Sequence, residues 1–138
     1  MNKPELAVGT CGTATSIVED ADLADKVGLS TSDTFPAVYA TSRMIALMEL
    51  AAARAMVPAL GDGENSVGVT VDIEHTRPTP PGASVTAEAY YLGRDGKLYL
   101  FEVLARDDAG PIGRGRHKRA VVDANRLEER AAQRRGPG

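Results

Sequence analysis

The longest regular pattern in the chain runs from Thr41 to Leu60, where apolar side chains recur at intervals of three and four residues. The apolar positions are Met44, Ile45, Leu47, Met48, Ala51, Ala52, Ala55 and Met56. This spacing matches the 3.6-residue period of an α-helix and predicts one long helix, with Thr41 or Ser42 as its N-cap. Because few polar residues interrupt the segment, we expect the helix to be buried on most sides.

Alternation of apolar and polar side chains predicts strands before and after this helix. The expected strands cover residues 7–20, 66–77, 83–93, 97–107 and 111–123. Turns rich in Gly, Pro and Asp separate the last four, so consecutive strands can pair antiparallel. Within 66–77, one face is expected to carry Val67, Val69, Val71, Ile73 and His75.

The remaining segments predict loops and one short helix. Residues 21–36 read as a loop with one helical turn near Ala24, 125–135 as a charged helix, and 134–138 as a disordered tail. No repeat or linker divides the chain, so 1–138 is expected to form one domain. This order predicts an α+β fold in which an antiparallel sheet wraps around one long central helix. That layout resembles the hotdog fold.

Composition narrows the classes of function. One Cys and two His among 138 residues argue against a disulfide framework or a metal site. A formal net charge of −3 is not typical of a nucleic-acid-binding domain. The sequence contains no run of 18 apolar residues, so we expect no membrane-spanning segment. The N-terminus lacks the apolar core of a secretion signal. We therefore expect a cytoplasmic protein with no metal, no nucleic-acid partner and no membrane partner.

Glu49 is the one acidic residue in the apolar stretch 45–53. The residues three and four positions away are all apolar, so no intrahelical ion pair explains its presence. Burial of a carboxylate without a partner is costly. Glu49 is therefore either a functional group or a residue whose helix face is exposed or meets an arginine from elsewhere.

His75 ends the apolar face of the strand 66–77 and is expected to point at the same interior as Glu49. An imidazole and a carboxylate that converge from two elements are typical of a general acid–base pair. The alternative is a histidine whose hydrogen bonds are satisfied within the core.

Thr41 begins the helix eight residues before Glu49, about 12 Å along the axis and turned by roughly 80°. The two side chains cannot touch within one helix, but both could reach one substrate or a site shared between two chains. Thr41 is either an N-cap or a reacting hydroxyl, and the two roles are compatible because a helix N-terminus favours developing negative charge.

Other residues are candidates for substrate contacts. Gly68 permits close approach of a ligand or marks a β-bulge. Phe35 precedes the helix and is either a pocket lid or a core plug. The basic run 114–119 either binds the phosphates of a nucleotide-bearing substrate or forms a solvated face, and from it we take Arg116 and Arg119 as candidates.

Three stretches resemble the fluoroacetyl-CoA thioesterase family of hotdog-fold enzymes. They are FPAVYATSRMIALMELAAARAM, SVGVTVDIEHTRPTPPG and IGRGRHKRAVV, which lie between Phe35 and Val122. The distinctive features are a Thr and a Glu eight residues apart on the helix and a strand that ends His-x-x-Pro-x-Pro-x-Gly.

The resemblance implies a catalytic set of Thr41, Glu49 and His75, a pocket glycine at Gly68 and a lid-like aromatic at Phe35. It implies hydrolysis of a short-chain acyl-CoA, with fluoroacetyl-CoA among the candidates, by a homodimer with sites at the subunit interface. Either the Thr or the Glu would be the nucleophile, and the His would move protons. Coenzyme A is part of the substrate, and no cofactor is implied. The alternative on the same fold is a non-catalytic acyl-CoA-binding module.

Overall fold

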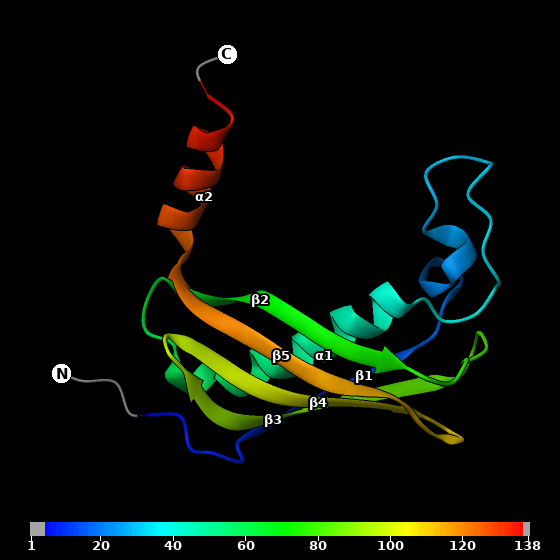
Figure 1. Ribbon diagram of the computed structural model, residues 1–138, viewed down its shortest axis with the longest axis horizontal. Helices are drawn as coiled ribbons and strands as arrows, with labels where there is room; N and C mark the ends of the chain where they lie inside the picture. The colour runs from blue at the N-terminus through cyan, green and yellow to red at the C-terminus, as the bar shows by residue number, and fades with distance from the viewer. Residues whose placement is uncertain (1–4, 137–138) are drawn as a thin grey trace.

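The computed structural model describes residues 5–136, in which a five-stranded antiparallel sheet packs against one long helix (Figure 1). The elements in chain order are β1 (Cys11–Ile17), the 3₁₀ helices η1 (Asp20–Asp22) and η2 (Ala24–Lys26), α1 (Thr41–Met56), the 3₁₀ helix η3 (Val57–Ala59), β2 (Glu64–His75), β3 (Ser84–Asp95), β4 (Leu98–Asp107), β5 (Gly110–Asp123) and α2 (Ala124–Arg134). The predicted α+β order is confirmed, and the structure has two 3₁₀ helices where one helical turn near Ala24 was predicted.

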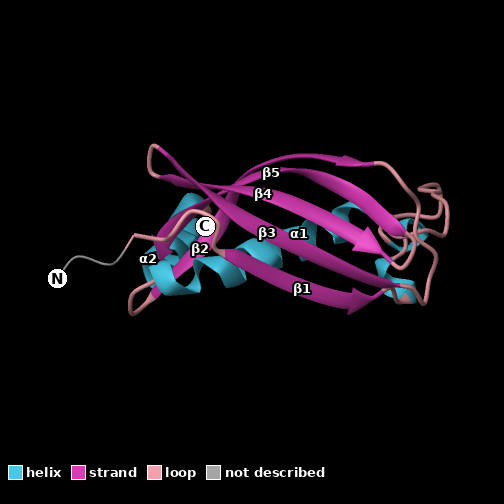
Figure 2. Cartoon of the chain, turned by 90° about the horizontal axis from the view of Figure 1, so that it is seen from below, coloured by secondary structure: helices cyan, strands magenta, loops and turns pink. Residues whose placement is uncertain are grey.

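The sheet curls along α1 and encloses the core between them (Figure 2). The strand order is β1-β3-β4-β5-β2, so β1 and β2 form the two edges. Small residues let helix and sheet approach closely. A Cβ atom at Gly12 would lie 2.0 Å from the Ala51 carbonyl oxygen, so any side chain at that position would push α1 away from β1.

One side of α1 remains uncovered, and the prediction of a helix buried on most sides is wrong for this chain. The sheet covers the side that carries Met44, Met48, Ala51, Ala52, Ala55 and Met56. On the opposite side Arg43 and Ala46 are exposed, and Leu50 is 43% exposed. A single sheet can cover only one side of a helix, so an apolar sequence here does not produce burial all round.

A β-bulge in β2 changes which residues face α1. The pairing of β2 with β5 shifts between Gly68 and Thr70, so Gly68 pairs with Arg119 and Val71 with His117. The extra residue interrupts the alternation, so Gly68 joins His75 on the helix-facing side while Val67 turns to the other side. The prediction of one face from Val67 to His75 is therefore wrong for Val67, which lies before the bulge.

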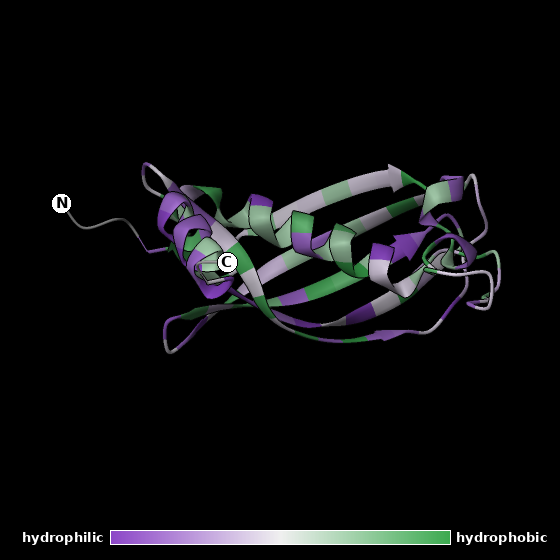
Figure 3. Cartoon of the chain, turned by 90° about the horizontal axis from the view of Figure 1, so that it is seen from above, coloured by the Kyte–Doolittle hydropathy of each residue, from purple (hydrophilic) through white to green (hydrophobic). Residues whose placement is uncertain are grey.

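The C-terminal helix α2 stands away from the sheet and buries no side chain (Figures 1 and 3). Its N-cap is Asp123, whose side chain accepts a hydrogen bond from the backbone N–H of Arg126 at 2.9 Å. The helix includes Arg134, and the Gly136 N–H donates to the Gln133 carbonyl. The predicted disorder of residues 134–138 stays a prediction, and residues 137–138 lie outside the described residues.

Candidate active site

The start of α1 meets the end of β2 through a hydrogen bond between Thr41 and His75. The Thr41 Oγ1 atom lies 2.7 Å from His75 Nδ1. The N-cap of the helix is Ala40, and no side chain caps this end. The prediction that Thr41 or Ser42 is the N-cap is therefore wrong, and the Thr41 hydroxyl is engaged with the imidazole instead.

His75 presents an unused nitrogen. Its Nε2 atom is buried and has no hydrogen-bond partner among the described residues. Burial lowers the pKa of His75 below its usual 6.5, and the nearby backbone of Arg77 opposes this shift. A ring with this lowered pKa is neutral at pH 7, and in the tautomer that carries its proton on Nε2, the Nδ1 lone pair accepts a hydrogen bond from the Thr41 hydroxyl.

Tyr39 packs against His75 and was not selected from the sequence. The two rings meet edge to face with centroids 6.5 Å apart. Burial, assisted by Asp22, raises the pKa of Tyr39 to about 12, so the phenol stays neutral. Its position two residues before the predicted helix was the only available signal. We interpret Tyr39 as a packing residue that restricts the orientation of the His75 ring.

Glu49 lies in a second cluster, farther along α1 and β2. Its Oε2 atom is 3.5 Å from Nη1 of Arg119 on β5. A Cβ atom added to Gly68 would lie 2.3 Å from the same carboxylate oxygen, so this carboxylate rests directly over the Gly68 backbone. Glu49 therefore meets an arginine from another element, as one of the two alternatives expected. Gly68 both borders the β-bulge and is closely approached by the Glu49 carboxylate.

Arg119 is buried, at 6% exposure, and its polar atoms are engaged. Its Nε and Nη2 atoms donate to the side chain and the carbonyl of Ser66, at 2.9 and 2.8 Å. Its Nη1 atom donates to Nε2 of His117 at 3.0 Å. The sequence did not indicate Ser66 or His117 as candidates. Ser66 begins an expected strand with an apolar face, and His117 lies within the basic run 114–119.

The basic run does not form one patch. Arg114 and Arg116 are exposed, whereas Arg119 turns inward toward Glu49. Arg116 borders a shallow hollow whose other charged members include Asp72, Glu74 and Glu102. These carboxylates balance the outward-facing arginines, as expected for a solvated strand face.

Phe35 is 52% exposed in the loop before α1. It is therefore not a core plug in this chain, and the lid interpretation is left as the alternative. The loop around it, residues 25–37, is exposed throughout (Figure 1).

The structure brings Thr41 and His75 together, and separately Glu49, Gly68 and Arg119. The separation between Thr41 and Glu49 is about 12 Å along the helix axis. No single bond in a substrate can touch both clusters of one chain at once.

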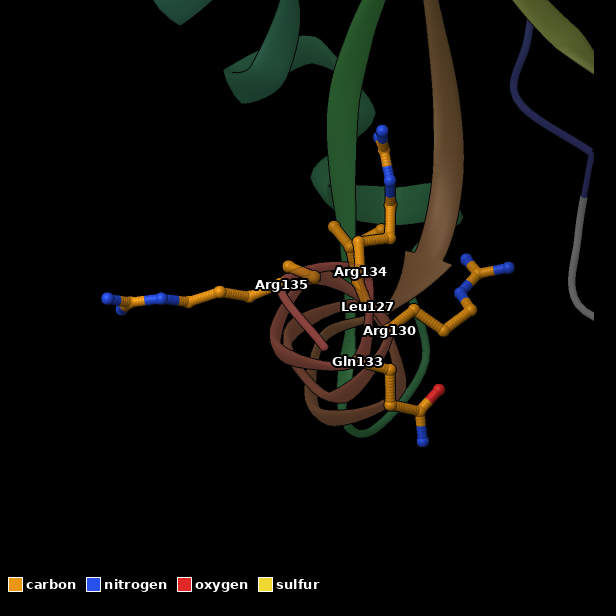
Figure 4. A pocket seen from close by; sticks show the side chains of 6 residues that line it. Leu127, Arg130, Gln133, Arg134 and Arg135 are labelled. Atoms are coloured by element: carbon orange, nitrogen blue, oxygen red, sulfur yellow. The ribbon is translucent and has the colours of Figure 1, made fainter. Parts of the chain in front are cut away.

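Other parts of the described chain offer weaker candidates. A hollow beside α2 is lined by Leu127, Arg130, Ala131, Gln133, Arg134 and Arg135, but its long side chains point away from one another (Figure 4). Within residues 5–136, no three His, Cys, Asp or Glu side chains gather as a metal site would require. No helix in that range has the length and apolar character to cross a membrane.

Replacing Gly68 with alanine is expected to lower activity at least about tenfold with little loss of stability. The new methyl group would overlap the Glu49 carboxylate, which lies at the end of a flexible, half-exposed side chain and can move. It would also lie 3.1 Å from Cε1 of the buried His117, a contact that a shift of a few tenths of an ångström relieves. Steady-state kinetics and thermal unfolding of Gly68→Ala test this, with Thr70→Ala on the same strand as the control. Unchanged kcat in Gly68→Ala would argue against a role for the Glu49 position.

Comparison with known proteins gives consistent matches. The family model for the fluoroacetyl-CoA-specific thioesterase matches residues 18–125. A fluoroacetyl-CoA thioesterase from Streptantibioticus cattleyicolor is 39% identical over 104 residues, which are 75% of each chain. A solved structure of the fluoroacetyl-CoA thioesterase FlK is 34% identical, with a TM-score of 0.88, and the match covers 94% of this chain and 98% of that one.

More distant structures agree on the architecture. A thioesterase-superfamily member from Thermus thermophilus is 25% identical, with a TM-score of 0.83, over 95% of this chain and 96% of that one. The curled sheet around α1 is thus the predicted hotdog fold, which is confirmed. On the family model and the curated relative together, this chain belongs to the fluoroacetyl-CoA thioesterase family.

Proposed function

We propose that this protein hydrolyses a short-chain acyl-CoA, with fluoroacetyl-CoA among the candidates, to the free acid and CoA. The observation that carries the proposal is the 2.7 Å hydrogen bond between Thr41 and a neutral His75, in a chain that belongs to a thioesterase family. Because the chain is proposed to act on a CoA ester, a cytoplasmic location remains our expectation.

The Thr41–His75 pair supports a two-step reaction. His75 Nδ1 takes the hydroxyl proton as Thr41 Oγ1 attacks the thioester carbonyl, and the imidazolium returns that proton to the departing CoA thiolate. Thr41 stands at the first position of α1, where the N-terminal end of the helix dipole favours the developing oxyanion. Water then cleaves the acyl-threonine ester, which yields the acid and restores the hydroxyl.

Glu49 fits the second step if the site is shared between two chains. We propose a homodimer in which the β2 strands of two protomers pair antiparallel, with Gly68 of one chain opposite His75 of the other. The Glu49 carboxylate that rests on Gly68 would then face the partner's Thr41–His75 pair and orient the hydrolytic water.

The exposed edge of β2 supports this arrangement. β2 is a 12-residue edge strand, and Val69 and Val71 on it are 51% and 42% exposed. A long edge strand with exposed apolar side chains is a template for pairing with another chain. The same strand carries Gly68 and His75, so pairing there would complete the site.

Phe35, Arg116 and Arg119 keep separate proposed roles. Phe35 stands six residues before Thr41 and would cover the acyl group from its exposed loop. Arg116 is exposed and would contact a CoA phosphate in competition with the carboxylates around it. Arg119 is engaged with Glu49 and would act on the substrate only through that carboxylate.

A thiol-release assay across acetyl-, fluoroacetyl-, branched and long-chain acyl-CoA esters tests the function. We expect turnover on at least one short ester. Calorimetric binding of an acyl-CoA without thiol release would support the binding-module alternative and overturn the enzyme. Release only from long-chain esters would overturn the substrate class.

A further inference from the structure

A buried network joins β5, β2 and α1 behind Glu49, and one histidine lies at its centre. His117 on β5 is 1% exposed. Its Nδ1 atom lies 2.9 Å from the Thr70 carbonyl oxygen, and its Nε2 atom lies 3.0 Å from Nη1 of Arg119. Thr41–His75 chemistry does not use this imidazole, so its burial among polar groups calls for another explanation.

The two partners of His117 permit only one form of the ring. A carbonyl oxygen can only accept a hydrogen bond, so Nδ1 must carry the proton that it donates to Thr70. A guanidinium can only donate, so Nε2 must be the unprotonated acceptor for Arg119. An imidazolium would direct an N–H at a cation 3.0 Å away, so protonation would break this contact.

We propose that His117 is a positioning residue that fixes the Arg119 guanidinium and, through it, holds the Glu49 carboxylate over the backbone of Gly68. Arg119 donates to both His117 and Glu49 through the same Nη1 atom, so its orientation is shared between them. Ser66 holds only the Nε and Nη2 atoms of this guanidinium. Loss of the acceptor on His117 would leave a buried N–H of Nη1 without a partner and weaken the hold of Nη1 on the carboxylate.

The groups packed around His117 make the neutral ring its natural state. The charged groups that face it are Arg119 from its own strand and Glu49 from α1. The neighbouring strands contribute the Thr70 carbonyl and two apolar residues aligned with it, Val71 on β2 and Phe101 on β4. Burial lowers the pKa of His117 below 6.5, and Arg119 lowers it further, while Thr70 and Glu49 oppose this.

This proposal rests on the proposed thioesterase activity, and three substitutions test it. In His117→Gln, the side-chain amide oxygen can replace the Nε2 acceptor. In His117→Asn, the shorter amide keeps a donor near Thr70 but loses the acceptor, and His117→Leu loses both. We expect kcat to fall about tenfold in the Asn and Leu variants, as a buried donor loses its acceptor, and to recover to within about threefold in the Gln variant.

A double-mutant cycle with Glu49→Gln separates positioning from general stability. If His117 acts through Glu49, His117→Leu should lower kcat by less than about twofold in the Glu49→Gln background. Val85→Ala, a core truncation on β3 outside the network, should give the same relative loss in both backgrounds. Equal losses for Gln, Asn and Leu at position 117, or an additive cycle, would overturn the proposal.

Nitrogen-15 NMR of the wild-type protein gives a readout that does not depend on turnover. We expect His117 to show the Nδ1–H tautomer at pH 7 and to titrate below 6.5. An Nε2–H tautomer or a cationic ring at pH 7 would overturn the network itself. Absence of turnover with the expected tautomer would instead contradict the proposed function and leave the hydrogen-bond network intact.

Discussion

Replacing His75 with alanine is expected to lower kcat/KM for a short acyl-CoA by at least about 100-fold. The substitution removes the side chain that hydrogen-bonds the Thr41 hydroxyl, which cannot lose its proton without a base. Because β2 ends at His75 and the ring is only partly buried, the fold should persist. Thiol-release kinetics and circular dichroism on the same preparation measure both effects.

Thr41→Val is the matched partner of this substitution. It keeps a β-branched side chain at the helix start but removes the hydroxyl. Because the two groups act as a unit, the double variant should be hardly slower than either single variant. Ser42→Ala, which changes an exposed hydroxyl on the same turn, serves as the control and should retain full activity. Activity in His75→Ala within tenfold of the wild type would remove His75 from the mechanism.

The same assignment fixes the sign of the pH dependence. Since burial lowers the pKa of His75, the ring is the neutral base above that pKa and loses its lone pair as the pH falls through it. The wild-type rate should therefore be flat near pH 7 and fall on the acid side of 6.5. A rate that does not fall anywhere on the acid side of 6.5 before the protein unfolds contradicts the role of His75 as the base.

The architecture was predictable because its signals are local and periodic. The repeat in 41–60 and the alternation in the later strands give the correct order and type of every major element. The local pattern did not predict the features that depend on contacts between distant segments. The bulge at Gly68 depends on its pairing with β5, and the exposed side of α1 depends on how far one sheet can reach.

The candidate site divides in the same way. Glu49 and His75 stand out because they are polar residues in apolar stretches. His117 is hidden within a basic run, and its role depends on the Thr70 carbonyl, 47 positions away in the sequence. The role of such a residue depends on contacts between distant segments and does not appear as a periodic pattern in the sequence. It can therefore be recognised only in the folded structure.

Heterodimers of two inactive variants are expected to regain about half of the wild-type activity, because the proposed site combines two chains. In a dimer of one His75→Ala chain and one Glu49→Gln chain, one site receives both defects. The other combines the intact Thr41–His75 pair of the second chain with the intact Glu49 of the first. Co-expression with two different affinity tags and sequential purification isolates this heterodimer for the thiol-release assay.

A site contained within one chain gives the opposite result. Each chain of the heterodimer would then carry one defect in its own site, and activity would stay at the level of the single variants, about 100-fold below wild type. A heterodimer of His75→Ala with Thr41→Val is the control, because both defects fall in the same half of the site. In the shared arrangement each of its sites lacks one member of the pair, so it should show no recovery. Recovery in the first heterodimer, with Glu49→Gln homodimers inactive, therefore identifies Glu49 as the contribution of the second chain. Recovery in neither heterodimer places Thr41, His75 and Glu49 of one active site in the same protomer and overturns the shared site.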